Sequence, residues 1–184
     1  SFQALGDRTL NLPAGSLIIR DEAGIVSLAG IAGGAATGCT EGTGTVLLES
    51  AVFDAAAIAR TGQALGVLTD ARSRFERGVD SALALPALDA AAALIQELCG
   101  GAIHGVAQAG EAPGPANAIP FATGEMASLT GLDLTEEDIN ATLTGLGFEK
   151  AAGGYLPPSW RHDCGHTADL VEEVLRVRGY DALP

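Results

Sequence analysis

The sequence predicts a mixed α/β (α+β) protein that is organised as two domains. Apolar residues make up 47% of the 184 residues and charged residues only 18%, which is typical of a folded chain. Short extended runs and amphipathic helical stretches occur in both halves. Residues 111–119, rich in proline and glycine, have no hydrophobic periodicity. We therefore expect a first domain over residues 1–110, a linker over 111–119 and a second domain over 120–184.

Two strands are expected to form a hairpin early in the first domain. The apolar runs at residues 16–20 and 25–29 flank the polar turn 21–24. The glycine-rich stretch 30–38 follows. It lacks the Gly-Lys-Ser/Thr ending of a Walker loop and does not match G-x-G-x-x-G, so tight turns are favoured over a phosphate site. Residues 45–50 predict a third strand.

Two helices follow in the first domain. Asp54 is a typical N-cap for an alanine-rich helix that is expected to end at Gly66. A second helix is expected from about residue 83 to 98, with Pro86 in its first turn, where a missing backbone N–H is tolerated.

The second domain is expected to contain three helices and a hairpin. The pattern indicates a short helix over 125–130 and a longer one capped by Thr135. Residues 148–156 predict a hairpin closed by glycines. The last helix begins after His166 or Thr167, either of which is suited to cap it, and its apolar side chains recur at helical spacing.

Charge and composition argue against a nucleic-acid-binding protein and against a membrane protein. The chain has 10 Lys and Arg against 23 Asp and Glu, a net charge of −13, and both halves are acidic. A negative surface repels phosphate and disfavours a freestanding nucleic-acid-binding protein, including a DNA-binding one. No run reaches the roughly 18 apolar residues of a membrane span, so we expect no membrane association. Three cysteines without framework spacing favour a reducing cytoplasm. Because the chain starts without methionine, we expect a piece of a longer protein.

An acidic cluster in the last helix is the most informative candidate site. Asp169, Glu172 and Glu173 lie at i, i+3 and i+4, and Asp163 comes six residues before them. A bound cation would remove their mutual repulsion, and hard carboxylate oxygens suit Mg²⁺. The alternative is a solvated acidic face near a helix N-terminus, and spacing alone favours that alternative.

Two other clusters invite a functional interpretation. Residues 69–78 hold three of the nine arginines beside two acids, and internal ion pairs are favoured over phosphate contacts. Three possible zinc ligands, His162, Cys164 and His166, lie within five residues. The chain has no second cluster of such ligands, whereas a structural zinc site usually combines two separated pairs. We therefore favour a structural role for both clusters.

Several motifs in this chain resemble those of a known family. Leu-Ala-Gly-Ile-Ala-Gly-Gly at 28–34, Val-Leu-Leu-Glu-Ser-Ala-Val-Phe at 46–53 and Thr-Asp-Ala-Arg-Ser-Arg-Phe-Glu-Arg-Gly-Val-Asp at 69–80 resemble the B3/B4 region of bacterial phenylalanine–tRNA ligase β subunits. Pro-Ser-Trp-Arg-His-Asp at 158–163 and the segment 169–181 resemble the B5 domain of that family. The motifs occur in the family's order and span nearly the whole chain.

The resemblance implies a truncated B3/B4-like domain followed by a small winged-helix-like B5 domain. In the family, the B3/B4 region hydrolyses tyrosine that is wrongly attached to the phenylalanine tRNA. The residues of its editing pocket map onto Gly33, Glu49, Thr69 and Ala71. Glycine leaves room for the misacylated residue, and Glu49 is suited to recognise a tyrosine hydroxyl that phenylalanine lacks.

The resemblance also implies partners and a metal. A Mg²⁺ site in B5, shared with the α subunit, maps onto Asp163, Asp169, Glu172 and Glu173, and this reverses the preference for a solvated face. The implied enzyme is a cytoplasmic α2β2 aminoacyl-tRNA ligase that binds tRNA and whose α subunit uses ATP. The fragment by itself is expected to be inactive.

Two departures from the family keep other interpretations open. Ala35 and Thr37 stand where the family has acidic and serine residues, and the editing-pocket histidine of the family is expected to precede Ser1. A purely structural scaffold is therefore one alternative. A winged-helix nucleic-acid-binding module is the other, although 4 basic residues against 11 acidic ones over 120–184 count against it.

Overall fold

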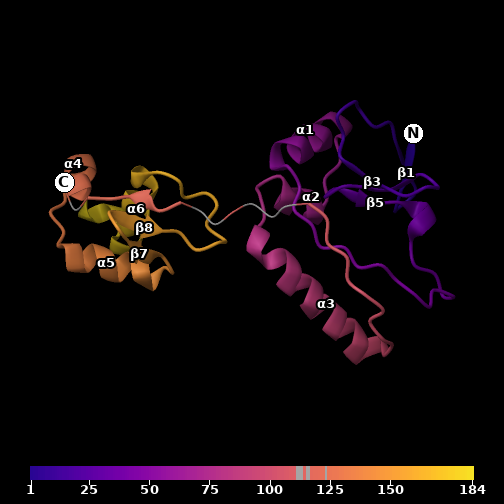
Figure 1. Ribbon diagram of the computed structural model, residues 1–184. Coiled ribbons are helices and arrows are strands. Elements are labelled where there is room, and N and C mark those ends of the chain that lie inside the picture. The colour runs from indigo at the N-terminus through magenta and orange to yellow at the C-terminus, as the bar shows by residue number, and fades with distance from the viewer. Residues whose placement is uncertain (111–113, 115–116, 123) are drawn as a thin grey trace. The chain divides into compact units, whose positions relative to one another are not determined.

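The computed structural model describes residues 1–110, 114, 117–122 and 124–184. The chain forms two compact units, unit 1 over Ser1–Ala112 and unit 2 over Pro113–Pro184, each with its own helices and strands (Figure 1). Both units combine α-helices with small antiparallel sheets, so the mixed α+β fold class is confirmed.

The described residues of unit 1 form five short strands in two antiparallel sheets. They are β1 (Phe2–Ala4), β2 (Arg8–Leu10), β3 (Ile18–Arg20), β4 (Ile25–Leu28) and β5 (Ala32–Gly33). β1 pairs with β2, and the second sheet has the order β3-β4-β5. The predicted hairpin is confirmed: the Asp21 carboxylate accepts hydrogen bonds from the backbone N–H groups of Ala23 and Gly24 at 2.8 and 2.9 Å, which closes the turn.

The helices of unit 1 follow the sheets. They are the 3₁₀ turn η1 (Ala35–Thr37), α1 (Ala55–Leu65), α2 (Asp70–Phe75), the 3₁₀ turn η2 (Ser81–Leu83) and α3 (Ala84–Cys99). The two predicted helices are confirmed. Asp54 accepts the N–H of Ala57 at 2.6 Å, and Gly66 ends α1 in the left-handed conformation at φ 62°.

The predicted strand over residues 45–50 is wrong. This segment has no regular structure, and Leu47 is 97% exposed. A strand needs a hydrogen-bonded neighbour, and among the described residues no strand pairs with it. The third strand of this sheet is instead β5, within the glycine-rich stretch. β1, β2 and α2 were not predicted from the sequence.

The core of unit 1 lies where β1, β2 and β4 meet α1. Its buried side chains are Phe2, Ala4, Leu10, Leu28, Ile31, Ile58 and Val67. The strand β5, within the glycine-rich stretch, is joined to the N-terminal hairpin, because Leu5 N–H donates to the Gly33 carbonyl at 2.9 Å.

In the part of unit 2 that the structure describes, a three-stranded sheet packs with three α-helices. Its elements are β6 (Ile119–Pro120), α4 (Gly124–Thr130), α5 (Glu136–Gly145), β7 (Glu149–Ala151), β8 (Gly154–Leu156), α6 (Thr167–Arg178) and the 3₁₀ turn η3 (Tyr180–Ala182). The sheet order is β6-β8-β7. The three predicted helices and the hairpin are confirmed, and Thr135 caps α5 by accepting the N–H of Asp138. Of the two candidate caps for α6, the structure has His166.

The core of unit 2 contains more buried side chains than the core of unit 1. It comprises Ile119, Met126, Ile139, Leu143, Phe148, Tyr155, Cys164, Leu170, Val171, Val174 and Leu175. These side chains come from all three helices and from β6 and β8. The loop that enters α6 is consequently anchored at Cys164.

One helical stretch is unusually apolar for its exposure. By length and composition alone, Ser81–Cys99 is long and apolar enough to cross a membrane, although Asp89 and Glu97 interrupt its apolar residues. No residue of α3 is buried, and the helix extends away from the sheets of unit 1 (Figure 1). One such helix is weak support for a membrane segment.

Candidate functional site

Thr69 joins the start of α2 to the glycine-rich turn. Its hydroxyl donates to the Ile31 carbonyl at 2.9 Å and accepts the N–H of Arg72 at 3.0 Å. The same side chain therefore caps α2 and holds it against the turn that precedes Gly33. Both hydrogen-bonding functions of the hydroxyl are used in this way.

Gly33 lies in β5, paired with Ser27 of β4. A Cβ atom at this position would lie 3.1 Å from Cδ1 of Leu5, which is tighter than an ordinary contact. Glycine therefore lets the β1–β2 hairpin approach the turn closely.

Ala71 and Glu49 are less closely tied to this turn. Ala71 is the second residue of α2 and is exposed. Glu49 lies in the irregular segment that leads to α1 and is exposed, but partial burial of its carboxyl raises the pKa above the usual 4.5. Of the four predicted pocket residues, the structure brings Thr69 and the strand of Gly33 to one turn. The described contacts do not join Glu49 or Ala71 to them.

The arginine-rich segment forms internal contacts, as predicted. Arg72 Nε donates to Glu76 Oε2 at 2.9 Å, and its Nη1 donates to the Val67 carbonyl at 2.7 Å. The Arg72 side chain is only 12% exposed and lies across α1 at Gly62. This arginine therefore fastens α2 to α1.

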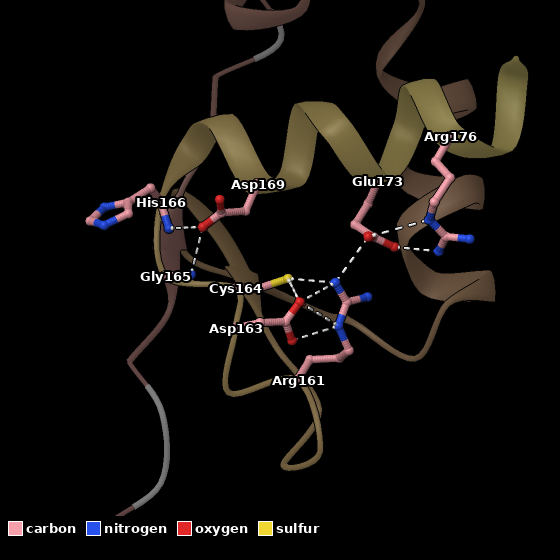
Figure 2. A network of polar contacts seen from close by, with 8 residues as sticks. All are labelled: Arg161, Asp163, Cys164, Gly165, His166, Asp169, Glu173 and Arg176. Carbon is pink, nitrogen blue, oxygen red and sulfur yellow. Dashed lines mark hydrogen bonds and ion pairs between the residues drawn. The ribbon is translucent and has the colours of Figure 1, made fainter. Parts of the chain in front are cut away.

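The acidic cluster of unit 2 is organised around Arg161 (Figure 2). The guanidinium binds Asp163 with two nitrogens, Nε to Oδ1 at 2.9 Å and Nη2 to Oδ2 at 2.8 Å. Nη2 also lies 2.9 Å from Glu173 Oε1 and from Cys164 Sγ. Its Cζ lies 5.9 Å from the centroid of the Phe148 ring. Arg161 therefore connects the loop before α6 with α6 itself.

These contacts shift the pKa values of the groups that take part. Hydrogen bonds from Arg161 lower the pKa of Asp163 to about 2, and those from Arg161 and Arg176 lower the pKa of Glu173 to about 2. Burial raises the pKa of the Cys164 thiol to about 11. The carboxylates are thus held ionised and the thiol neutral near pH 7.

The other two acids of the predicted metal site have different surroundings. The Asp169 carboxylate accepts the backbone N–H groups of Gly165 and His166, each at 2.8 Å, and these bonds lower its pKa (Figure 2). It therefore stabilises the start of α6. Glu172 is exposed on the same helix.

The observed arrangement does not fit a Mg²⁺ site made of these four carboxylates. Both oxygens of Glu173 accept from arginines, Oε1 from Arg161 and Oε2 from Arg176 at 2.6 Å. Both oxygens of Asp163 accept from Arg161. Within the described part of the chain, no group of three or more His, Cys, Asp or Glu side chains is arranged to hold a metal ion. The Mg²⁺ ligand set stays a prediction.

Arg161 is the residue of this network that the sequence analysis missed. Its signal was present, since it is the only lysine or arginine between Lys150 and Arg176 and comes two residues before Asp163. The spacing of the acids favours a bound cation but does not indicate that the guanidinium of Arg161 supplies it.

Each unit has a hollow among its described residues. The first has a volume of about 140 Å³ and lies in unit 2 beside the Lys150–Glu136 ion pair and Tyr155. The second is an open depression of about 490 Å³ in unit 1, lined by residues 8–10 and 65–68. Neither is lined by a predicted site residue, although the second ends next to Thr69.

Both units match known domain families. Residues 1–100 match the B3/4 domain, and residues 119–180 match the tRNA synthetase B5 domain. The chain is 44% identical to the phenylalanine–tRNA ligase beta subunit of Bradyrhizobium diazoefficiens, over 98% of this chain and 23% of that protein. The beta subunits of Cereibacter sphaeroides and Brucella suis are each 46% identical, over 95% and 98% of this chain and 22% and 23% of their own lengths.

The chain therefore spans about a quarter of the length of the curated relatives that it matches. The two domain matches follow the order of the two structural units. Together with this level of identity, they establish the family of the chain. The chain belongs to the family of phenylalanine–tRNA ligase beta subunits, of which it contains a B3/4 and a B5 domain.

Proposed function

We propose that unit 1 contributes to the hydrolytic removal of tyrosine from mischarged phenylalanine tRNA. The observation that carries this proposal is the Thr69 hydroxyl bonded to the Ile31 carbonyl, which holds the start of α2 beside the glycine-rich turn. This bond links Thr69 to the residues that lead into Gly33 of β5, and we take this link as the frame of the proposed pocket. A fixed frame suits a pocket that must distinguish two amino acids by a single hydroxyl.

Glu49 is the proposed group for recognising tyrosine. An ionised carboxylate accepts a hydrogen bond from a phenol, and phenylalanine offers no such donor. Partial burial raises the pKa of Glu49, and partial removal of water strengthens a hydrogen bond to it. A site that leaves a polar group unpaired when phenylalanine binds discriminates strongly.

Ala71 is the proposed limit on the size of the pocket. It follows Thr69 by two residues, in the first turn of α2. A small side chain there leaves room for an aromatic ring between the helix and the turn. A large side chain at this position is expected to fill that space.

Unit 2 is proposed to contribute to assembly with the α subunit of a cytoplasmic α2β2 ligase that acts on tRNA and uses ATP through the α subunit. Its surface supports this role, because Leu129, Trp160, Val177 and Tyr180 are all exposed. Aromatic side chains such as Trp160 and Tyr180 are enriched at protein interfaces. The Mg²⁺ implied by the resemblance is not included in this proposal, since the carboxylates do not fit it.

DNA binding by unit 2 is not proposed. All four of its basic side chains, Lys150, Arg161, Arg176 and Arg178, form ion pairs with carboxylates of the same unit. Binding a phosphate backbone would require these pairs to break, in a unit with 11 acidic residues.

The test uses the complete αβ enzyme and follows hydrolysis of tyrosyl-tRNA specific for phenylalanine. We expect wild type to hydrolyse it and the Glu49→Ala and Ala71→Trp variants to lose this activity, with phenylalanine charging intact. Ala56→Trp is the matched control, because Ala56 is likewise the exposed second residue of its helix, α1. Equal hydrolysis by wild type and both variants would refute the pocket. Absence of hydrolysis by wild type would favour a scaffold role.

A further inference from the structure

The guanidinium of Arg161 lies where a metal ion would need to lie to contact the two central acids of unit 2. It contacts Asp163 on one side and Glu173 on the other, at 2.8 and 2.9 Å (Figure 2). These two acids are ten residues apart, one in the loop and one in α6. A single cation thus connects two segments that the resemblance expects a divalent metal to connect.

The charges within this network are balanced without a further ion. Asp163 and Glu173 contribute two negative charges, and Arg161 and Arg176 contribute two positive charges. Glu173 is only 8% exposed, and both of its oxygens are bound to arginine nitrogens. A Mg²⁺ ion entering here would have to displace both guanidinium groups or be repelled by them.

The surroundings of Arg161 fit a permanent structural role. Its side chain is 21% exposed and contacts the Phe148 ring and the buried Cys164 as well as the acids. A planar guanidinium with several donors suits such a set of acceptors better than a lysine ammonium does. The loop that enters α6 is therefore held to the core by one side chain.

We propose that Arg161 is the structural cation of unit 2, and that in this chain Asp163 and Glu173 are its ion-pair partners rather than Mg²⁺ ligands. This inference is independent of the proposed editing function. It departs from the metal site that the family resemblance implies. It also gives Asp169 the separate role of capping α6.

Trp160 supplies a selective probe for this proposal. It is the only tryptophan of the chain and lies next to Arg161, so its fluorescence reports unfolding of unit 2. Thermal unfolding of the 184-residue chain is followed with this signal in EDTA and in millimolar Mg²⁺. The variants are Arg161→Met, Arg161→Lys and Glu173→Gln. Arg178→Met is the control, because Arg178 forms a more exposed ion pair, with Asp138, in the same unit.

We expect the wild-type midpoint to be the same in EDTA and in Mg²⁺. Arg161→Met and Glu173→Gln should lower it clearly more than Arg178→Met does, and Arg161→Lys should lie between wild type and Arg161→Met. A bound metal at several times its Kd would instead raise the wild-type midpoint by about 5 °C or more. Such a rise, or an Arg161→Met midpoint equal to that of the control, would overturn the proposal. If Arg161→Met does not fold, the comparison of wild type in EDTA and Mg²⁺ decides by itself.

Discussion

At the scale of single residues, the hydroxyl of Thr69 connects the start of α2 to the glycine-rich turn of the candidate editing site. It caps α2 and also binds the Ile31 carbonyl. Thr69→Val should destabilise unit 1 by about 1–3 kcal/mol, since it removes a cap and leaves a carbonyl without its donor. Thr69→Ser should retain most of the stability. Urea unfolding by far-UV circular dichroism measures this change, and Trp160 fluorescence should show unit 2 unaffected.

Valine and serine are useful together because they separate shape from hydrogen bonding. Valine keeps the branched shape of threonine, whereas serine keeps the hydroxyl. If Thr69→Val is as stable as wild type, the hydroxyl does not hold α2 to the turn. The frame proposed for the editing pocket would then lose its support.

Gly62 is a second residue whose substitution should reveal a close contact. A Cβ at Gly62 would overlap the Arg72 side chain, which lies across α1 at this point. Alanine normally stabilises a helix interior relative to glycine by about 0.5–1 kcal/mol. Here we expect Gly62→Ala to destabilise unit 1 by about 1–3 kcal/mol, because Arg72 would lose its bonds to Val67 and Glu76. Urea unfolding measures both the size and the sign of this change in the free energy of unfolding.

The matched control is Gly145→Ala in α5. No atom lies within 4 Å of a Cβ built at Gly145, and its φ is not positive. This substitution should therefore show the ordinary stabilisation of a helix by alanine. A stabilising effect of both substitutions would mean that Arg72 does not lie against α1.

At the scale of elements, α3 combines an apolar composition with an exposed position. Leu94 and Leu98 are exposed, and no residue of the helix is buried. Leu94→Glu should therefore change the free energy of unfolding by less than about 0.5 kcal/mol. It should also reduce self-association of the chain, because it interrupts an exposed apolar surface. Sedimentation velocity and urea unfolding measure the two effects.

Ile58→Ala in α1 is the contrasting variant. Ile58 is buried in the core of unit 1, and its truncation should cost about 2–5 kcal/mol. If Leu94→Glu costs a similar amount, α3 packs against the rest of unit 1 in solution.

The elements also show what the sequence predicts well. The helix α1 was predicted from a cap residue and a terminating glycine, and α5 was predicted from a cap residue and an apolar stripe. The strand expected at residues 45–50 was wrong because strand formation depends on a partner that local sequence does not specify. β1 and β2 have three residues each, which is too few for a periodic pattern to be visible.

The candidate sites were predictable to different degrees. The four acids of unit 2 were found from their spacing, but their spacing does not state which cation neutralises them. Arg161 lies twelve residues from Glu173, so only folding reveals the contact. In unit 1, neither α2 nor the capping role of Thr69 was predicted from the sequence. The bond of Thr69 to Ile31 spans 38 residues, so only folding reveals it.

At the scale of the whole molecule, the two units should respond differently to acid. Asp163 and Glu173 have pKa values of about 2 in the folded chain, below their usual 3.8 and 4.5. A lowered carboxyl pKa stabilises the folded state above the usual value, and this contribution is lost as pH falls through the folded value. The thermal unfolding midpoint of unit 2, followed by Trp160 fluorescence, should therefore decrease as the pH is lowered from about 5 to about 2.

Substitution of one glutamate should reduce this pH dependence. Glu173→Gln removes one of the two groups with a strongly lowered pKa, whereas Glu172→Gln changes the exposed neighbour. We expect a shallower acid-induced decrease for Glu173→Gln and an unchanged one for Glu172→Gln. Identical pH profiles for both variants would show that the Arg161 network does not set the acid stability of unit 2.

The proposed recognition of tyrosine by Glu49 is tested most directly by one ratio. In the complete αβ enzyme, the rate of hydrolysis of tyrosyl-tRNA is divided by that of phenylalanyl-tRNA, for wild type and for Glu49→Gln. Glu41→Gln, an exposed acid of the same unit, is the control. We predict that Glu49→Gln lowers the ratio by about tenfold to a hundredfold, as expected for loss of a hydrogen bond to a charged group. An unchanged ratio would contradict the editing role assigned to Glu49.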